Sequence, residues 1–179
     1  MDDSINYAEY TVEKKPEGKN LKKRFGMIAL YLLALAVVIV LITLTKGAGA
    51  VWGGVMFVLL IALVWFTWRL VKEERKYEVV NAKFKVQELN GSGKGTVVFE
   101  NLVSEFSIIA PMTEEYKDQW ANADVIMDER GNSKSSDSYF ARLEKDGKTT
   151  VIYFEAINKM LKVMKFYNSK GTVVTTMRY

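Results

Sequence analysis

The sequence predicts an α+β protein anchored in a membrane, and three observations support this prediction. Residues 25–44 and 48–68 form two apolar runs without a charged residue. Residues 77–154 contain short runs of alternating apolar and polar residues between turn signals, as in β-strands. Residues 157–164 have the spacing of an amphipathic helix. We therefore expect a two-helix transmembrane hairpin, followed by a β-barrel or β-sandwich of about seven strands that ends in a helix.

The predicted hairpin covers residues 25–71, with helices over 25–45 and 48–70. A hydrocarbon core of about 30 Å requires about 20 helical residues, and each apolar run reaches that length. Only Thr45, Lys46 and Gly47 separate the runs, so the connection is a tight turn. The alternative is a signal peptide cleaved near residues 48–50. It is disfavoured because the first run is longer than a signal core and a second run follows at once.

The basic residues that flank the hairpin predict its orientation. Lys46 is the one basic residue between the two runs. The basic residues closest to the outer ends of the runs are Lys22, Lys23, Arg24, Arg69, Lys72, Arg75 and Lys76. Because lysine and arginine collect on the cytoplasmic side, we expect a multi-pass protein of the cell membrane with both termini in the cytoplasm.

Small residues at the start of the second run predict where helices pack. Gly49 and Gly53 are four residues apart, and Gly54 lies beside them. Glycines let helix backbones approach closely in lipid. We expect these three glycines to pack the two helices of one chain together. The alternative is that they pair with another membrane protein or with a second copy of this chain.

Charge and composition exclude several kinds of partner and chemistry. The formal net charge is +4, but residues 77–179 carry 14 basic and 14 acidic residues, so the excess lies beside the hairpin. We therefore expect no nucleic-acid partner. The chain contains neither cysteine nor histidine. It has no disulfide, thiol or zinc chemistry, and it lacks the commonest general base near neutral pH.

The segments outside the hairpin divide into three. Residues 1–24 are polar without a clear period, and we expect a flexible cytoplasmic arm. The alternative is that this arm docks on the soluble domain or on a partner. Residues 77–168 form the soluble domain, and residues 169–179 form a C-terminal tail.

Turn signals place the strands of the soluble domain. Asn81-Ala82 and Asp146-Gly147 predict two-residue hairpin turns, and residues 113–122 form a short helix in a long connection. Residues 129–138 (ERGNSKSSDS) are expected to be a mobile polar loop.

The final helix has one apolar and one basic face. Ile157, Met160, Leu161 and Met164 follow the i, i+3, i+4, i+7 spacing of a buried face. The other side of the helix carries a candidate surface patch of Lys159, Lys162 and Lys165.

These strands and the closing helix resemble a pleckstrin-homology-like (PH-like) domain, in which a C-terminal helix plugs the open end of a bent sheet. The chain also resembles an uncharacterised family of small bacterial membrane proteins with two transmembrane helices and a bacterial PH-like domain. The matching strings are residues 77–84 (YEVVNAKF), 108–111 (IIAP) and 154–168 (FEAINKMLKVMKFYN). Lipid-binding PH domains use a basic first hairpin loop. The Asn81-Ala82 turn has no charge, so the resemblance does not imply inositol-lipid binding.

No motif in the sequence carries a recognisable chemistry. Residues 91–96 resemble a phosphate loop but lack its first glycine, its magnesium-binding hydroxyl and the helix that should follow. The acids Asp124, Asp128, Glu129 and Asp137 do not have the spacing of a calcium loop. We predict no catalytic residue, no metal site and no cofactor.

The predicted function is therefore that of a non-catalytic module. We expect the hairpin to anchor a PH-like domain at the cytoplasmic membrane surface, where it binds a protein partner or scaffolds a complex. The alternative is a sensor of anionic lipid or of the membrane surface, acting through the flanking basic residues. An enzyme is the third and least supported reading.

Overall fold

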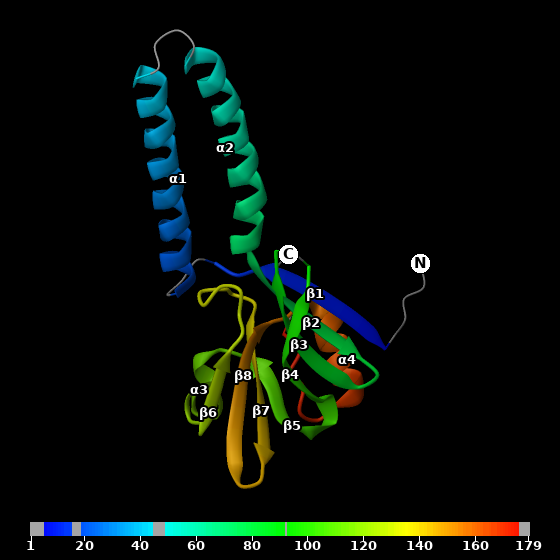
Figure 1. Cartoon of the computed structure of the whole chain (residues 1–179). Coiled ribbons are helices and arrows are strands. Elements are labelled where there is room, and N and C mark those ends of the chain that lie inside the picture. The colour runs from blue at the N-terminus through cyan, green and yellow to red at the C-terminus, as the bar shows by residue number, and fades with distance from the viewer. Residues whose placement is uncertain (1–5, 16–18, 45–48, 92, 176–179) are drawn as a thin grey trace. The chain divides into compact units, whose positions relative to one another are not determined.

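The computed structural model of the chain describes residues 6–15, 19–44, 49–91 and 93–175. It divides into two compact units (Figure 1). One is helical and comprises residues 15–73 with 90–92, and the other is rich in β-strands and comprises the rest of the chain.

The helical unit is a hairpin of α1 (Lys19–Leu44) and α2 (Gly49–Val71), which lie side by side (Figure 1). Both helices are long and apolar enough to cross a membrane. The Tyr31 and Thr67 hydroxyls form a hydrogen bond between them, with their oxygens 2.6 Å apart. Most of their large apolar side chains are exposed. The first helix begins six residues before the predicted start, because the polar residues after Gly18 include no helix breaker.

The β-rich unit contains two four-stranded sheets. The first has the order β1-β2-β3-β4 and the second β5-β7-β8-β6, in which β6 is parallel to β8. The strands are β1 (Tyr7–Glu13), β2 (Glu73–Val80), β3 (Lys83–Asn90), β4 (Gly95–Leu102), β5 (Phe106–Pro111), β6 (Val125–Asp128), β7 (Ser138–Lys145) and β8 (Lys148–Glu155).

The strand β1 corrects the prediction of a flexible arm over residues 1–24. It pairs antiparallel with β2, in a register that places Tyr7 opposite Val80 and Glu13 opposite Glu74. Ala8 is fully buried, and Tyr10 and Val12 pack against the core. This part of the arm therefore belongs to the first sheet, as the docking alternative required.

The two predicted hairpin turns are confirmed. Asn81 and Ala82 have φ angles of 50° and 65°, and Asp146 and Gly147 have φ angles of 53° and 72°. Positive φ at both central residues is the geometry of a type I′ turn, whose twist matches that of the flanking strands. The strand β5 begins only at Phe106, because η2 (Val103–Glu105) forms a 3₁₀ turn before it.

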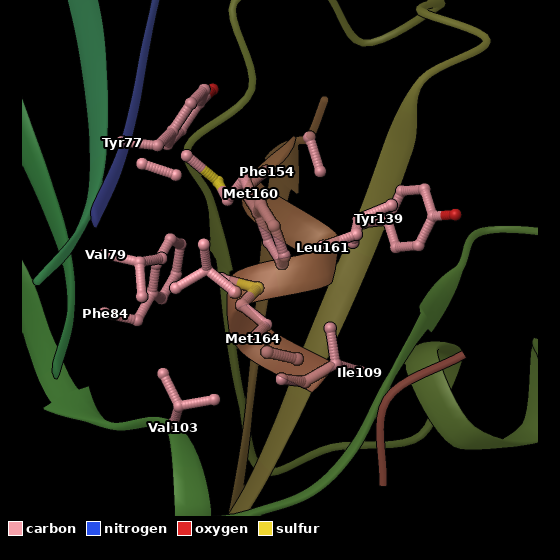
Figure 2. Close-up of a cluster of buried hydrophobic side chains, with 14 of the residues drawn as sticks. Tyr77, Val79, Phe84, Val103, Ile109, Tyr139, Phe154, Met160, Leu161 and Met164 are labelled. Carbon is pink, nitrogen blue, oxygen red and sulfur yellow. The ribbon is translucent and has the colours of Figure 1, made fainter. Parts of the chain in front are cut away.

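The helix α4 (Asn158–Tyr167) lies at the centre of the main core. Met160, Leu161 and Met164 are fully buried, as the apolar spacing predicted. Each such side chain stabilises the fold by about 1.5–3 kcal/mol. Figure 2 shows side chains from both sheets around these three residues, namely Tyr77, Val79, Phe84, Ile109, Tyr139 and Phe154.

The opposite face of the second sheet has a smaller core of its own. It contains Phe140, Val151 and Tyr153, and Tyr116 and Trp120 pack against it. The two aromatic residues come from the connection that forms η3 (Glu114–Tyr116) and α3 (Lys117–Ala121), near the predicted short helix. Because both faces are covered, β7 begins with four consecutive buried residues instead of an alternating pattern.

The chain continues in contact with the β-rich unit after α4, beyond the predicted boundary at residue 168. Ile109 of β5 donates its N–H to the Gly171 carbonyl at 2.7 Å and accepts the Val173 N–H at 2.8 Å. The Asn168 amide bonds the carbonyls of Val103 and Phe106 at 3.1 and 2.7 Å. Residues 171–173 of the expected tail are thus held against β5, whereas residues 176–179 lie outside the described part of the chain.

Candidate functional site

Five of the seven predicted flanking basic residues lie at the ends of the hairpin helices. Lys22, Lys23 and Arg24 belong to the first turns of α1, Arg69 to the last turn of α2, and Lys72 follows α2 directly. The Lys23 ammonium is 3.3 Å from a Glu73 carboxylate oxygen. The side chains of Lys22, Arg69 and Lys72 are exposed.

The other two, Arg75 and Lys76, lie on β2, and this corrects their assignment as membrane-flanking cations. Arg75 is only 5% exposed. Its Nε and Nη1 are 2.7 Å from Glu129 and 3.1 Å from Glu88, which are ion-pair distances without the alignment of hydrogen bonds. Lys76 pairs with Glu9 of β1 at 2.8 Å. Because β2 begins at Glu73, alternate residues face the interior, and Arg75 lies on the same side as Tyr77 and Val79.

Arg75 and the residues near it hold the loop of residues 129–138 in place. The Tyr77 hydroxyl donates to the Glu129 carbonyl at 2.8 Å, and buried Glu155 accepts the Asn132 N–H at 2.7 Å. A side chain at Gly131 would meet Val12 of β1 at 2.7 Å. The loop therefore packs against the sheet and is not the mobile segment that its polar sequence predicted.

Arg130 fixes the same loop from its other side. Its guanidinium binds both Asp128 carboxylate oxygens, lies 5.2 Å from the Tyr153 ring centre, and donates to the Ser133 carbonyl at 2.9 Å. Burial alone would raise the pKa of the Asp128 carboxyl. The hydrogen bonds and positive charge of Arg130 outweigh burial and lower that pKa below its ordinary value.

Three of the acids considered for a calcium loop, Asp124, Asp128 and Glu129, are engaged by other groups of the β-rich unit. Asp124 accepts the Thr149 N–H at 2.7 Å, Asp128 binds Arg130, and Glu129 binds Arg75. Within the described ranges no three acids are placed to hold a metal ion. The two ion pairs of Arg75 link β2 to Glu88 of β3 and to Glu129 after β6, so this buried arginine connects separate parts of the β-rich unit.

The three glycines of α2 have different surroundings. Gly49 is the first residue of the helix. A Cβ at Gly53 would lie 2.3 Å from Ile42 of α1, so this glycine permits close packing inside the hairpin. A Cβ at Gly54 would meet nothing within 4 Å. Gly53 thus has the intrachain role, and Gly54 lies on an open face of α2.

The outer face of α4 carries the predicted lysine patch. Lys159, Lys162 and Lys165 are exposed there, as the sequence predicted. Phe166 lies among them and is 64% exposed, and the sequence reasoning missed it. The available signal was its position five residues after Leu161, which is outside the apolar spacing of the helix.

Comparison with known proteins identifies one family. The family model described as "Bacterial PH-like domain (DUF6106)" matches residues 3–174, and the match includes β1, both hairpin helices and α4. No curated protein and no solved structure matches the chain significantly.

Proposed function

Because the chain belongs to the bacterial PH-like domain family, we propose that it is a non-catalytic PH-like module anchored in the cell membrane. The hairpin of α1 and α2 crosses the bilayer twice, and the β-rich unit lies at its cytoplasmic surface. There it binds a protein partner or holds a membrane complex together.

The exposed apolar surface of the hairpin is the observation that carries this proposal. Side chains such as Leu33 and Trp65 are 65% and 76% exposed, and similar residues lie all around both helices. Soluble proteins rarely expose apolar patches larger than a few hundred Å². A helix that satisfies its own backbone hydrogen bonds is stable in lipid with this surface outward.

The pairing of β1 with β2 supports an even number of crossings. The strand β1 precedes α1, and β2 follows α2. All seven residues of β1 are paired with β2, from Tyr7 opposite Val80 to Glu13 opposite Glu74. Two segments in one sheet lie on one side of a bilayer, so the hairpin must leave that side and return to it.

The charges around the hairpin support a cytoplasmic position for this side. Lys22, Arg69 and Lys72 are exposed at or next to the helix ends nearest the sheet strands in sequence, whereas Lys46 is the one basic residue between the helices. This asymmetry follows the positive-inside rule without any contribution from Arg75.

Purification of the full chain in a mild detergent tests the proposed binding of a protein partner. We expect one membrane protein to co-purify in a constant ratio, and that protein used as bait should recover the chain. The matched control is Leu161→Asp, which disrupts the core around α4 and leaves the hairpin sequence unchanged. Loss of the partner from this variant supports the proposal. An identical set of proteins with both chains, or none with either, contradicts it.

A further inference from the structure

The outer face of α4 combines positive charge with one projecting aromatic ring. At about 100° per residue, Lys162 and Phe166 are neighbours one turn apart at the centre of the exposed face. Lys165 lies beside them, and exposed Lys170 follows the helix. The sequence of α4, NKMLKVMKFY, contains no acidic residue.

Phe166 is held in this exposed position by its neighbour. Its ring meets the Tyr167 ring edge-on, with centroids 5.1 Å apart, and Tyr167 packs against the main core. Among the described residues of the β-rich unit, no other large apolar side chain is more than 46% exposed. The ring therefore projects from a rigid helix instead of folding back on the surface.

Two of the three acids on β1 and η2, the elements that pack against α4, already have partners. The helix packs against β1 and η2. Their acids include Glu9, which is neutralised by Lys76, and Glu13, which also has a partner. Glu105 of η2 is exposed. Lys159 is engaged in an interaction of its own, so the exposed lysines considered at this face are Lys162, Lys165 and Lys170.

We propose that the outer face of α4 docks on the surface of an anionic bilayer, with Phe166 at the level of the headgroups and the three lysines over lipid phosphates. Cations on flexible stems around a single ring fit a laterally mobile, diffuse negative surface. Each lysine near such a surface strengthens association by about fivefold. The inference rests on the proposed membrane anchorage, which makes docking intramolecular, so that weak contacts suffice.

Site-specific labelling of the full chain tests this docking, because the protein contains no cysteine. A fluorophore is attached at Ser169→Cys, an exposed position beside the patch that leaves Phe166 and the lysines intact. The labelled chain is placed, one copy per disc, in nanodiscs of phosphatidylcholine or of equal parts phosphatidylcholine and phosphatidylglycerol. Some lipids carry a quencher on the upper acyl chain. Labels at Lys148→Cys, on the β7–β8 hairpin, and at Val58→Cys, in α2, serve as references.

We expect several-fold stronger quenching at position 169 in the anionic discs than in the neutral ones. Added salt should weaken it, and the double variant Lys162→Glu/Lys165→Glu should abolish it. Phe166→Ser should reduce it while leaving the salt dependence. The label at position 148 should stay unquenched in both discs.

Three results would overturn the docking. Equal, weak quenching at position 169 in both discs, with strong quenching at position 58, would refute docking while leaving the membrane anchorage intact. An unquenched label at position 58 would refute the anchorage and the docking with it. A further measurement uses a water-soluble quencher and compares discs with one and with two copies of the chain. If position 169 is shielded only in the discs with two copies, the α4 face contacts a second chain and not the bilayer.

Discussion

Arg75 is held by carboxylates from two different parts of the β-rich unit, Glu88 on β3 and Glu129 after β6. The arginine is buried, and the Glu129 side chain is 14% exposed. Buried ion pairs add little to stability compared with an apolar replacement, but removal of one partner leaves the other charge buried without compensation. Loss of Arg75 should therefore lower the stability of the folded β-rich unit.

Arg75→Ala should destabilise the β-rich unit by about 3–5 kcal/mol, because Glu129 loses its counter-charge. The measurement is denaturant unfolding of the full chain in detergent, followed by near-ultraviolet circular dichroism. Arg69→Ala removes an exposed basic residue at the end of α2 and should change stability by less than about 0.5 kcal/mol. Equal effects of the two substitutions would contradict the structural role of Arg75 and would favour its prediction as a membrane-flanking cation.

The Asp128 carboxyl gives the β-rich unit an acid-sensitive contact. Arg130 lowers its pKa in the folded protein, against the opposing effect of burial, while the unfolded chain has an ordinary value of about 3.9. A lowered folded-state pKa contributes stability that is complete above the unfolded pKa. That stability is lost as the pH falls through the folded pKa.

Asp128→Asn should therefore flatten the decline in melting temperature below about pH 4. At pH 7 the variant should be less stable than the natural chain, and the difference should shrink as the pH falls. Thermal unfolding of both chains between neutral and strongly acidic pH measures this difference. A constant difference at every pH would show that the Arg130 contact does not depend on the charge of Asp128.

At the scale of the element, α4 has its roles divided between two faces. Leu161 is fully buried among side chains of the main core, and Lys162 is exposed one residue later. Leu161→Asp places an unpaired charge in this core, which costs several kcal/mol out of a total stability of about 5–15 kcal/mol. Lys162→Asp should be nearly neutral for folding.

We expect Leu161→Asp to abolish the near-ultraviolet signal of the packed aromatic residues while α1 and α2 retain their far-ultraviolet helical signal. Limited proteolysis should then cut the β-rich unit first. The chain with Lys162→Asp should behave like the natural protein in both measurements. Comparable damage from both substitutions would contradict the assignment of the buried face.

The elements that the sequence predicted are those defined by local signals. The α4 spacing, the Asn81-Ala82 turn and the two apolar runs each depend on residues close together in the chain. The strand β1 escaped prediction because its partner β2 lies beyond the whole hairpin, and a seven-residue strand has little pattern of its own. The burial of Arg75 was not predicted for the same reason, because its ion-pair partner Glu129 is far away in sequence.

The site could be predicted in part for the same physical reason. The α4 lysines follow from the helical period, which places Lys159, Lys162 and Lys165 outside the apolar spacing. The same period also places Phe166 outside the apolar spacing, but the exposure of this aromatic residue was not predicted. The fixed loop over residues 129–138 could not be predicted, because Glu155, Val12 and Tyr77, which contact it, come from three different strands.

At the scale of the whole molecule, the hairpin is an insertion between two paired strands. The chain forms β1, continues through α1 and α2, and returns to pair β2 with β1. A long-range pair of this kind forms late, because the closure of the intervening segment costs entropy before the pairing stabilises it. In a membrane, insertion of the hairpin would bring the ends of α1 and α2 to one side and lower that cost.

This arrangement makes a topological prediction that single cysteines can test. Lys46→Cys lies between the helices, Thr11→Cys lies on an exposed position of β1, and Lys148→Cys lies in the β7–β8 hairpin. In intact cells, a membrane-impermeant maleimide should label position 46 alone. After the membrane is permeabilised, positions 11 and 148 should be labelled as well. The last two must behave alike, because β1 and the later strands belong to one unit.

Labelling of position 11 but not position 148 in intact cells would contradict the pairing of β1 with its sheet. Labelling of both from outside, with position 46 protected, would reverse the orientation that Lys22, Arg69 and Lys72 predict.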